Sequence, residues 1–309
     1  MARSVLDAPQ FQTEEAAFEY VEARLWPTGP TCPHCGNADD KRIGRLSGKT
    51  TRPGLRKCYE CRKPFTVRMG SIFESSHLPL HLWLQIIHLM CASKKGISSR
   101  QIQRMLRCSM KTAWFLGHRI RLAMDPGAAA DPLGGAGKTV EADETELARS
   151  RKTKRPAGFR RRTHNPKVLS LIERGGNIRS VTLDHRGVGR HLRNLVHEDS
   201  RLVTDKAQHY KFRGFAQHES VDHSKFEWTR GDVHTNTLEG FFSVLKRGLI
   251  GVYQHVDKHH LDRYLAEFDF RQNNREKLGV NDTQRADIAL QGMKGKRLTY
   301  GTTTEAANV

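Results

Sequence analysis

The stretch Thr139-Val140-Glu141-Ala142-Asp143-Glu144-Thr145 decides the fold, because it opens a series of strand-like segments after an N-terminal half with helical periodicity. Two more strands are predicted at residues 167–172 and 178–183, joined as a hairpin by the turn Arg174-Gly175-Gly176-Asn177. The pattern then predicts a helix at 189–197, strands at 202–205 and 220–222, and a helix at 237–246. This order is that of an RNase H-like fold, an α/β core with a mixed five-stranded sheet and helices.

This order of strands and helices suggests a role for three acidic residues. Asp143 lies in the first strand, Asp205 ends the fourth, and Glu239 lies in the helix after the fifth. Carboxylates from three separate elements can converge at one end of a sheet, and their hard oxygens suit Mg²⁺ or Mn²⁺. Two such ions about 4 Å apart activate a nucleophile and stabilise the leaving oxygen of an in-line displacement. The chain holds 33 Asp and Glu residues, so the position of these three in the fold, and not the number of acids, singles them out.

A lysine follows the third acid at helical spacing. Lys246 lies seven residues after Glu239, almost two turns, so both side chains share one face of the helix. We expect Lys246, with Arg247 beside it, to bind a DNA phosphate next to the metals. An ordinary exposed lysine is the alternative.

The charge of the chain points to its partner. The formal net charge is +19, and a protein that neutralises phosphates releases their counterions, so nucleic acid is the expected partner. A basic protein that binds polyanions without chemistry is the alternative. No apolar run approaches the roughly 20 residues of a membrane span, and the first residues lack a signal-peptide core. We therefore expect no membrane partner and a cytoplasmic protein, nucleoid-associated when bound to DNA.

Four of the six cysteines form two Cys-x-x-Cys pairs, Cys32 with Cys35 and Cys58 with Cys61. Two such knuckles, here with 22 residues between them, predict a four-thiolate Zn²⁺ site. Four thiolates leave no position for water, so we expect the zinc to fold a short charged segment with few apolar residues. Several basic residues around the knuckles suit either a DNA contact or a solvated loop. They are Lys41, Arg42, Arg45, Lys49, Arg52, Arg56 and Lys57.

Residues 79–124 predict three helices in a helix-turn-helix region. The first spans about 80–92, and the second opens with the capping-box pattern Ser98-Ser99-Arg100-Gln101. The turn Arg107-Cys108-Ser109-Met110 leads into the third. A small helical bundle packed for its own sake is the alternative. If the region binds DNA, residues of the third helix face the groove, and they are Lys111, Thr112, Phe115, His118 and Arg119.

The predicted organisation has five parts. They are an N-terminal helix with the zinc ribbon at 1–78, the helix-turn-helix at 79–124, a linker rich in glycine, alanine and proline at 125–138, the catalytic core at 139–276 and a C-terminal tail of open role at 277–309. Within the core, residues 148–166 form a basic insertion without an acid, which we expect to grip DNA; a disordered charged loop is the alternative. Its predicted DNA-contacting residues are Arg151, Lys152, Lys154, Arg160, Arg161 and Arg162.

Over roughly residues 11–276 the chain resembles DDE-type insertion-sequence transposases of the ISXO-like branch. The resemblance rests on the paired Cys-x-x-Cys knuckles, Gly70-Ser71-Ile72-Phe73-Glu74-Ser75-Ser76-His77-Leu78-Pro79-Leu80-His81-Leu82-Trp83, Glu141-Ala142-Asp143-Glu144-Thr145 and His234-Thr235-Asn236-Thr237-Leu238-Glu239-Gly240-Phe241-Phe242-Ser243-Val244-Leu245-Lys246-Arg247-Gly248. The last stretch continues into His260-Leu261-Asp262-Arg263-Tyr264-Leu265-Ala266-Glu267-Phe268-Asp269-Phe270-Arg271. The resemblance implies an RNase H-like core, divalent metal and DNA strand transfer, with Asp143 and Asp205 as the first two acids.

Two residues are candidates for the third metal ligand, because the branch carries both Asn236 and Glu239. We favour Glu239, since a carboxylate binds Mg²⁺ more strongly than an amide and since Lys246 then falls at the usual offset. The chain departs from the branch at two places. It has Glu146-Leu147-Ala148 where members often have Tyr-Ile-Gly, and Phe242 where they have tryptophan, and neither change removes a metal ligand.

The sequence thus predicts a DNA transposase. The zinc ribbon and helix-turn-helix would bind the terminal repeats of a mobile element, and the core would hydrolyse a phosphodiester and join the free 3′-OH to target DNA. Cutting two ends needs two active sites, so a homodimer or higher assembly on double-stranded DNA is expected. The alternatives are a DNA-binding regulator with a vestigial nuclease core and a host-adopted metal-dependent nuclease that does not join ends.

Overall fold

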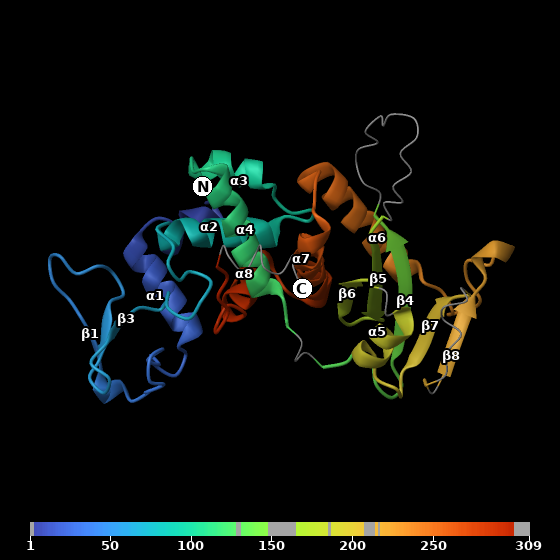
Figure 1. The fold of residues 1–309 in the computed structure, drawn as a ribbon, viewed down its shortest axis with the longest axis horizontal. Helices are drawn as coiled ribbons and strands as arrows, with labels where there is room; N and C mark the ends of the chain where they lie inside the picture. The colour runs from blue at the N-terminus through green and yellow to red at the C-terminus, as the bar shows by residue number, and fades with distance from the viewer. Residues whose placement is uncertain are drawn as a thin grey trace. The chain divides into compact units, whose positions relative to one another are not determined.

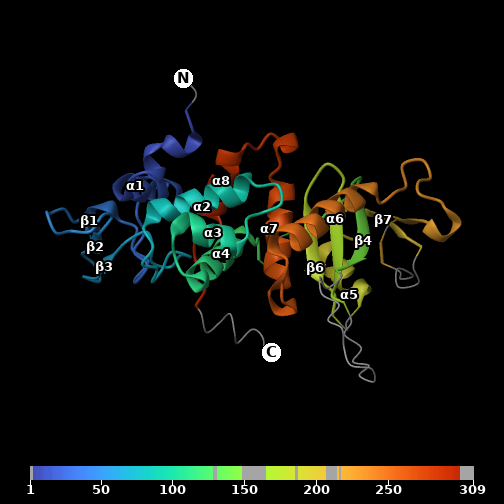
Figure 2. The same cartoon turned by 90° about the horizontal axis from the view of Figure 1, so that it is seen from above.

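The computed structural model describes residues 3–127, 131–147, 165–184, 187–206, 214–215 and 217–299. The chain divides into two compact units, of which the first comprises Met1–Asp125 with Arg275–Val309 and the second comprises Pro126–Asn274. The boundary falls at the start of the predicted linker. Figures 1 and 2 show the elements of each unit from two directions.

Helices dominate the first unit. They are α1 (Glu14–Leu25), α2 (Leu80–Ala92), α3 (Ser99–Leu106), α4 (Met110–Met124) and α8 (Asp282–Gln291). The hydroxyls of Ser98 and Ser109 cap α3 and α4 by accepting the backbone N–H groups of Gln101 and Thr112, so serine fixes where each helix begins. Arg107 ends α3 in the left-handed conformation, at φ 50°. Three helices, with a short turn between α3 and α4, therefore lie where the sequence analysis expected them.

The segment after residue 274 returns to the first unit. Asp287 of α8 accepts the Tyr20 hydroxyl at 2.6 Å and the Arg24 Nε at 2.5 Å, both from α1. The guanidinium of Arg285 donates to the Cys91 carbonyl at the end of α2, at 2.8 Å. At Gly292 a Cβ would lie 2.3 Å from the carbonyl oxygen of Ala123, so the chain passes α4 too closely for any side chain. Part of the predicted C-terminal tail is thus built into the first unit.

A small antiparallel sheet precedes α2 in the first unit. Its strands are β1 (Ile43–Arg45), β2 (Arg56–Cys58) and β3 (Pro64–Phe65), in that order. Its core holds Cys32, Ile43, Cys58 and Phe65, so half of the buried apolar residues are cysteines. An ion pair of 2.6 Å between Arg56 and Glu22 ties β2 to α1.

The second unit is built on one mixed sheet of five strands. They are β4 (Thr139–Glu146), β5 (Lys167–Glu173), β6 (Ile178–Thr182), β7 (Arg201–Asp205) and β8 (Gln217–Val221), in the order β6-β5-β4-β7-β8. The first three are antiparallel neighbours, while β4 pairs with β7, and β7 with β8, in parallel. The predicted mixed five-stranded sheet is confirmed. β8 starts three residues before its predicted start, in the polar sequence Gln217-His218-Glu219.

Helices cover both faces of this sheet (Figure 2). One face packs on α5 (Val188–Leu195), and the other on α6 (Asn236–Gly248) and α7 (Leu261–Asn273). Because side chains alternate along a strand, Val140 and Ala142 of β4 enter the core beneath α5. Glu141 and Asp143 therefore point to the face that carries α6. A π-helical turn, Leu249–Tyr253, extends α6 toward α7.

Among the described residues, no helix combines the length and the apolar character needed to cross a membrane.

Candidate functional site

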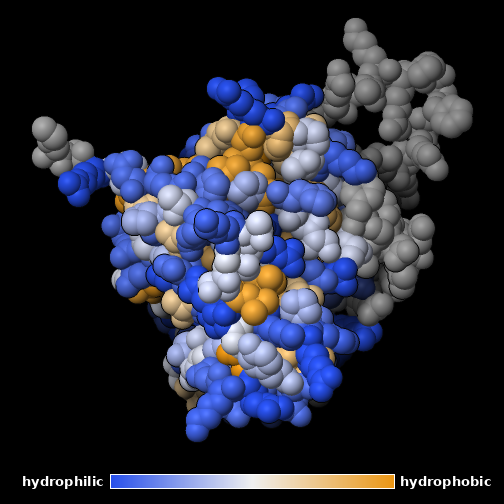
Figure 3. All heavy atoms as spheres, turned by 90° about the vertical axis from the view of Figure 1, so that its left-hand side faces the viewer, coloured by the Kyte–Doolittle hydropathy of each residue, from blue (hydrophilic) through white to orange (hydrophobic). Residues whose placement is uncertain are grey.

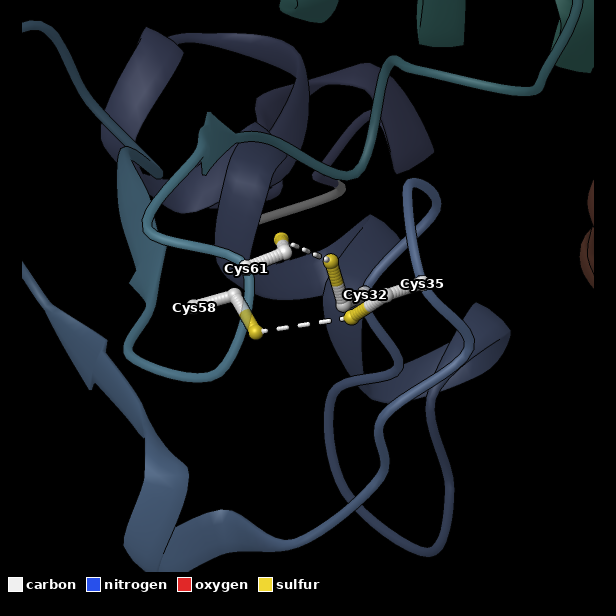
Figure 4. A group of neighbouring side chains, drawn as sticks. All are labelled: Cys32, Cys35, Cys58 and Cys61. Carbon is white, nitrogen blue, oxygen red and sulfur yellow. Dashed lines mark hydrogen bonds between the residues drawn. The ribbon is translucent and has the colours of Figure 1, made fainter.

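The four cysteines of the two knuckles form one cluster (Figure 4). Cys32 and Cys35 lie in the loop before β1, Cys58 ends β2, and Cys61 lies in the turn to β3. The Sγ atoms of Cys32 and Cys61 are 3.7 Å apart, as are those of Cys35 and Cys58, and all four lie within 4.8 Å of one another. These distances are far too long for disulfides, and all four thiols are free.

The cluster fits a tetrahedral zinc ion. Zn–S bonds of about 2.3 Å at tetrahedral angles place the sulfurs ~3.8 Å apart, close to the 3.7 Å found for both of these pairs. Backbone N–H groups of Cys61 and Glu60, with the side-chain amide of Asn37, lower the pKa of the Cys58 thiol. Against the lowering effect of the Asn37 N–H, burial and the three neighbouring thiols raise the pKa of the Cys35 thiol. Hydrogen bonds like those to Cys58 favour the thiolate, which is the form that binds metal. The two knuckles therefore form a four-cysteine metal-binding site.

Two of the predicted acids lie just beyond the paired residues of two neighbouring parallel strands. β4 and β7 pair Glu141 with Val203, and Asp143 and Asp205 each lie two residues beyond that pair. Adjacent residues of parallel strands point the same way, so both acids lie on the face of the sheet that carries α6. Glu239 lies in the first turn of α6. The three acids therefore come from β4, β7 and α6 to the same end of the sheet.

The charges of these acids act on one another. Burial, together with the charges of Asp205, Glu144 and Glu239, raises the pKa of Asp143 from 3.8 to about 7, against the lowering effect of the Glu144 N–H. That N–H donates to the Asp143 carboxylate at 2.7 Å. A carboxyl with a pKa near 7 is held in an environment that disfavours its negative charge, and a bound cation would relieve this cost.

Carboxylate oxygens are the donors that hard divalent cations prefer. Among the described residues, only the four cysteines form a group of three or more possible ligands whose ligand atoms lie within 4.8 Å of one another. The oxygens of the three acids are not gathered as closely. Like-charged carboxylates repel when no cation lies between them. Ligands of two ions about 4 Å apart also span more space than ligands of one ion. Asp143, Asp205 and Glu239 are candidate ligands because of the chemistry of their oxygens.

Helix α6 carries the remaining predicted residues of this site. Asn236, the alternative third ligand, is its exposed first residue. Lys246 is half-buried in its last turn, beside the exposed Arg247, whose Nε donates to the Ser243 carbonyl at 3.0 Å. Both cations lie at the end of α6 opposite Asn236 and Glu239.

Two predicted DNA contacts need correction. His118 is fully buried in α4 and Arg119 is 6 % exposed, so neither side chain faces solvent. The Arg119 Nε donates to the carbonyl of Leu298 at 3.3 Å, and its guanidinium lies 4.7 Å from the Phe115 ring centroid. The C-terminal segment thus covers the part of α4 that was expected to face a groove. We therefore withdraw His118 and Arg119 from the predicted DNA contacts.

Lys111 and Thr112 are exposed in the first turn of α4, where a groove or phosphate contact is geometrically possible. The Thr112 hydroxyl also lies 2.9 Å from the Ser109 hydroxyl, within the cap of that helix. The six predicted contacts of the basic insertion, Arg151, Lys152, Lys154, Arg160, Arg161 and Arg162, lie outside the described residues.

The zinc-ribbon end of the first unit is hydrophilic, with small scattered apolar patches (Figure 3). Three of its arginines pair with acids, namely Arg42 with Glu60, Arg45 with Glu19 and Arg56 with Glu22. Lys41, Lys49 and Arg52 are exposed. These exposed cations are better placed for a DNA phosphate than the paired arginines.

The sequence analysis gave no role to a buried polar group next to the acids. Glu141 is fully buried and accepts a hydrogen bond from the Arg174 Nε at 2.8 Å. It also accepts from the hydroxyl of Thr237 at 2.9 Å, at the start of α6. One signal was present in the sequence, because residues two apart on a strand share a face and Glu141 precedes Asp143 by two.

The cysteine cluster predicts a metal requirement for folding. In Cys58→Ser, bound zinc should fall from about one equivalent per chain to near zero, because one of four thiolates is lost. Amide hydrogens of residues 32–65 should then exchange rapidly, since metal binding supplies much of the folding free energy of such a segment. Metal analysis and hydrogen–deuterium exchange measure both effects. Cys108→Ser, a thiol outside the cluster, is the control, and equal zinc content in the two variants would contradict the assignment.

The raised pKa of Asp143 predicts how stability depends on pH. A carboxyl whose folded-state pKa exceeds its unfolded value costs stability as the pH rises from about 4 to about 7, and the cost persists above pH 7. With zinc retained and no Mg²⁺, Asp143→Asn should therefore be more stable than the wild type at pH 8 by about 2–4 kcal/mol, with a smaller gain at pH 5. Urea unfolding at both pH values measures this difference. A variant less stable than the wild type at pH 8 would refute the prediction.

Comparison with known proteins agrees with these two features. Residues 132–273, which carry the acid-bearing sheet, match the family of ISXO2-like transposase domains. Residues 12–64, which carry the four cysteines, match the family of transposase zinc-ribbon domains. The chain is also 28 % identical over 280 residues to a protein in the transposable element ISH50 of Halobacterium salinarum, a match that covers 84 % of this chain and 91 % of the relative. The resemblance to ISXO-like insertion-sequence transposases is thus confirmed over two domains, a zinc ribbon and a DDE-type transposase domain.

Proposed function

We propose that this chain is a DNA transposase that cuts the ends of a mobile element and joins the resulting 3′-OH groups to target DNA. In this proposal the five-stranded sheet is an RNase H-like core, and Asp143, Asp205 and Glu239 hold divalent metal. One observation carries the proposal: the three acids come to one end of the sheet, where burial and the charges of Asp205 and Glu239 act on the pKa of Asp143.

Two Mg²⁺ or Mn²⁺ ions would supply Lewis acidity for the attacking and leaving oxygens. The residues of the chain would position the cations and balance their charge. Asp143 would hold a cation as its carboxylate, so cation affinity should weaken as the pH falls below the Asp143 pKa of about 7. Glu239 is preferred to Asn236 as the third ligand, because a carboxylate adds charge that an amide lacks. Lys246 would hold a backbone phosphate without reading the base sequence.

The first unit would locate the element ends. Exposed cations of the zinc ribbon, with Lys111 and Thr112 at the start of α4, would contact DNA in a helix-turn-helix arrangement. The basic insertion at 148–166 would add phosphate contacts. Two ends must be cut and joined, so we propose that at least two copies of the chain assemble on DNA.

The test combines purified full-length chain, DNA carrying element ends, and Mg²⁺ or Mn²⁺. Asp143→Asn, Asp205→Asn and Glu239→Gln should each reduce cleavage and joining at least about 100-fold, because a ligand matters more than the outer partners whose loss costs about 10–100-fold. DNA binding in a gel-shift assay should persist. Asn236→Ala should be affected less than Glu239→Gln.

Glu146→Gln is the matched control. This acid lies on the same strand as Asp143 but points to the opposite face, and it is exposed beside Lys167 at 3.4 Å. It should retain wild-type cleavage. Binding without cleavage by the wild type would support a regulator with an inactive core, and cleavage without joining would support a nuclease.

A further inference from the structure

A fully buried carboxylate lies directly behind the proposed metal site. Glu141 is 0 % exposed in β4, two residues before Asp143 and on the same face of the sheet. Its Oε1 accepts the Arg174 Nε at 2.8 Å and the Thr237 hydroxyl at 2.9 Å, and its Oε2 accepts the backbone N–H of Thr237 at 3.2 Å. The Nδ1 of His234 lies 3.6 Å from Oε1. Both oxygens are therefore engaged.

Through these contacts Glu141, a residue of strand β4, caps the start of helix α6. The helix begins at Asn236, and its N-cap residue Thr235 makes no capping hydrogen bond through its side chain. Glu141 accepts an N–H of the first helical turn instead, and its negative charge faces the positive end of the helix dipole. The start of α6 is thus held by β4, and Glu239 lies two residues beyond the held residue Thr237.

The contacts extend into a chain of ion pairs. Arg174 also donates to the His234 carbonyl at 3.0 Å, and its Nη1 lies 4.0 Å from a carboxylate oxygen of Asp232. Asp232 accepts the Arg201 Nη2 at 3.0 Å, and the Nε of Arg201 donates to Glu219 at 2.5 Å. Arg201 begins β7, the strand that ends on Asp205. The chain of contacts therefore links β4, α6 and β7, the three elements that carry the acids.

A buried carboxylate is expensive, and a well-packed apolar pair would serve stability as well or better. A carboxylate at this point does something that an apolar side chain cannot, because it fixes the helix start through hydrogen bonds of defined direction. We propose that Glu141 is a positioning residue that sets the separation of Glu239 from Asp143 and so tunes metal affinity. This inference rests on the proposed function, since it takes those acids as ligands.

The matched control is another buried carboxylate of the same unit. Glu267 of α7 is also 0 % exposed, pairs with Arg271 and accepts the Tyr253 hydroxyl at 2.6 Å. It lies on an element that carries none of the three acids. Glu267→Gln therefore removes a buried ion pair of similar kind without touching the start of α6.

The experiment measures Mn²⁺ binding to the full-length, zinc-loaded protein by electron paramagnetic resonance, and DNA cleavage as a function of Mn²⁺ concentration. Glu141→Gln should weaken Mn²⁺ binding about 10–100-fold, as loss of an outer partner does. The Mn²⁺ concentration for half-maximal cleavage should rise by the same factor, with the rate regained at high Mn²⁺. Glu267→Gln should lower thermal stability while leaving both Mn²⁺ values unchanged.

A milder variant guards against misfolding of Glu141→Gln. Thr237→Val removes one hydroxyl at constant shape and should shift Mn²⁺ affinity in the same direction by a smaller factor. Wild-type Mn²⁺ affinity in Glu141→Gln, or equal shifts in Glu141→Gln and Glu267→Gln, would overturn the inference. If the wild type cleaves no DNA and Asp143→Asn binds Mn²⁺ as the wild type does, the proposed function itself fails.

Discussion

Negative charge brought together at one end of a sheet is the constraint on which the second unit depends. Asp143 and Asp205 each lie two residues beyond the last paired residues of the parallel strands β4 and β7, and Glu239 lies in the first turn of α6. Burial and these neighbours raise the pKa of Asp143 to about 7, a cost that nothing in the hydrophobic packing requires. Such a cost is consistent with a site for cations, because bound cations would offset it.

Metal would act differently in the two units. In the zinc ribbon the buried core is so small that two of its four members are metal-ligating cysteines, and the metal replaces a hydrophobic core. In the acid-bearing unit both faces of the sheet are packed by apolar residues of α5, α6 and α7, so the fold does not need the cation. There a cation would be needed for the reaction and not for folding.

Much of this architecture follows from local sequence. Helix α2 lies where its apolar periodicity placed it, and β4, β5 and β7 agree with their predicted spans to within two residues. The start of β8 was missed, because Gln217-His218-Glu219 has no apolar alternation and pairs at the edge of the sheet. This segment is a strand because it pairs with β7, and the strand propensity of its residues does not predict that pairing.

Two errors of interpretation have a common physical cause. His118 and Arg119 were expected to face DNA, yet they are buried, and Arg119 donates to Leu298, 179 residues away in the chain. Glu141 was given no role, because its partners Arg174 and Thr237 come from distant segments. Contacts between distant parts of the chain set the surroundings of these polar residues. Periodicity and spacing in the sequence therefore do not predict whether such residues are buried or which partners they have.

Anomalous X-ray scattering from crystals of the full-length protein grown with Mn²⁺ tests the central claim most directly. The account predicts manganese bound by Asp143, Asp205 and Glu239, as two peaks about 4 Å apart once DNA is present. Manganese scattering absent from this end of the sheet, with zinc present at the four cysteines, would contradict it.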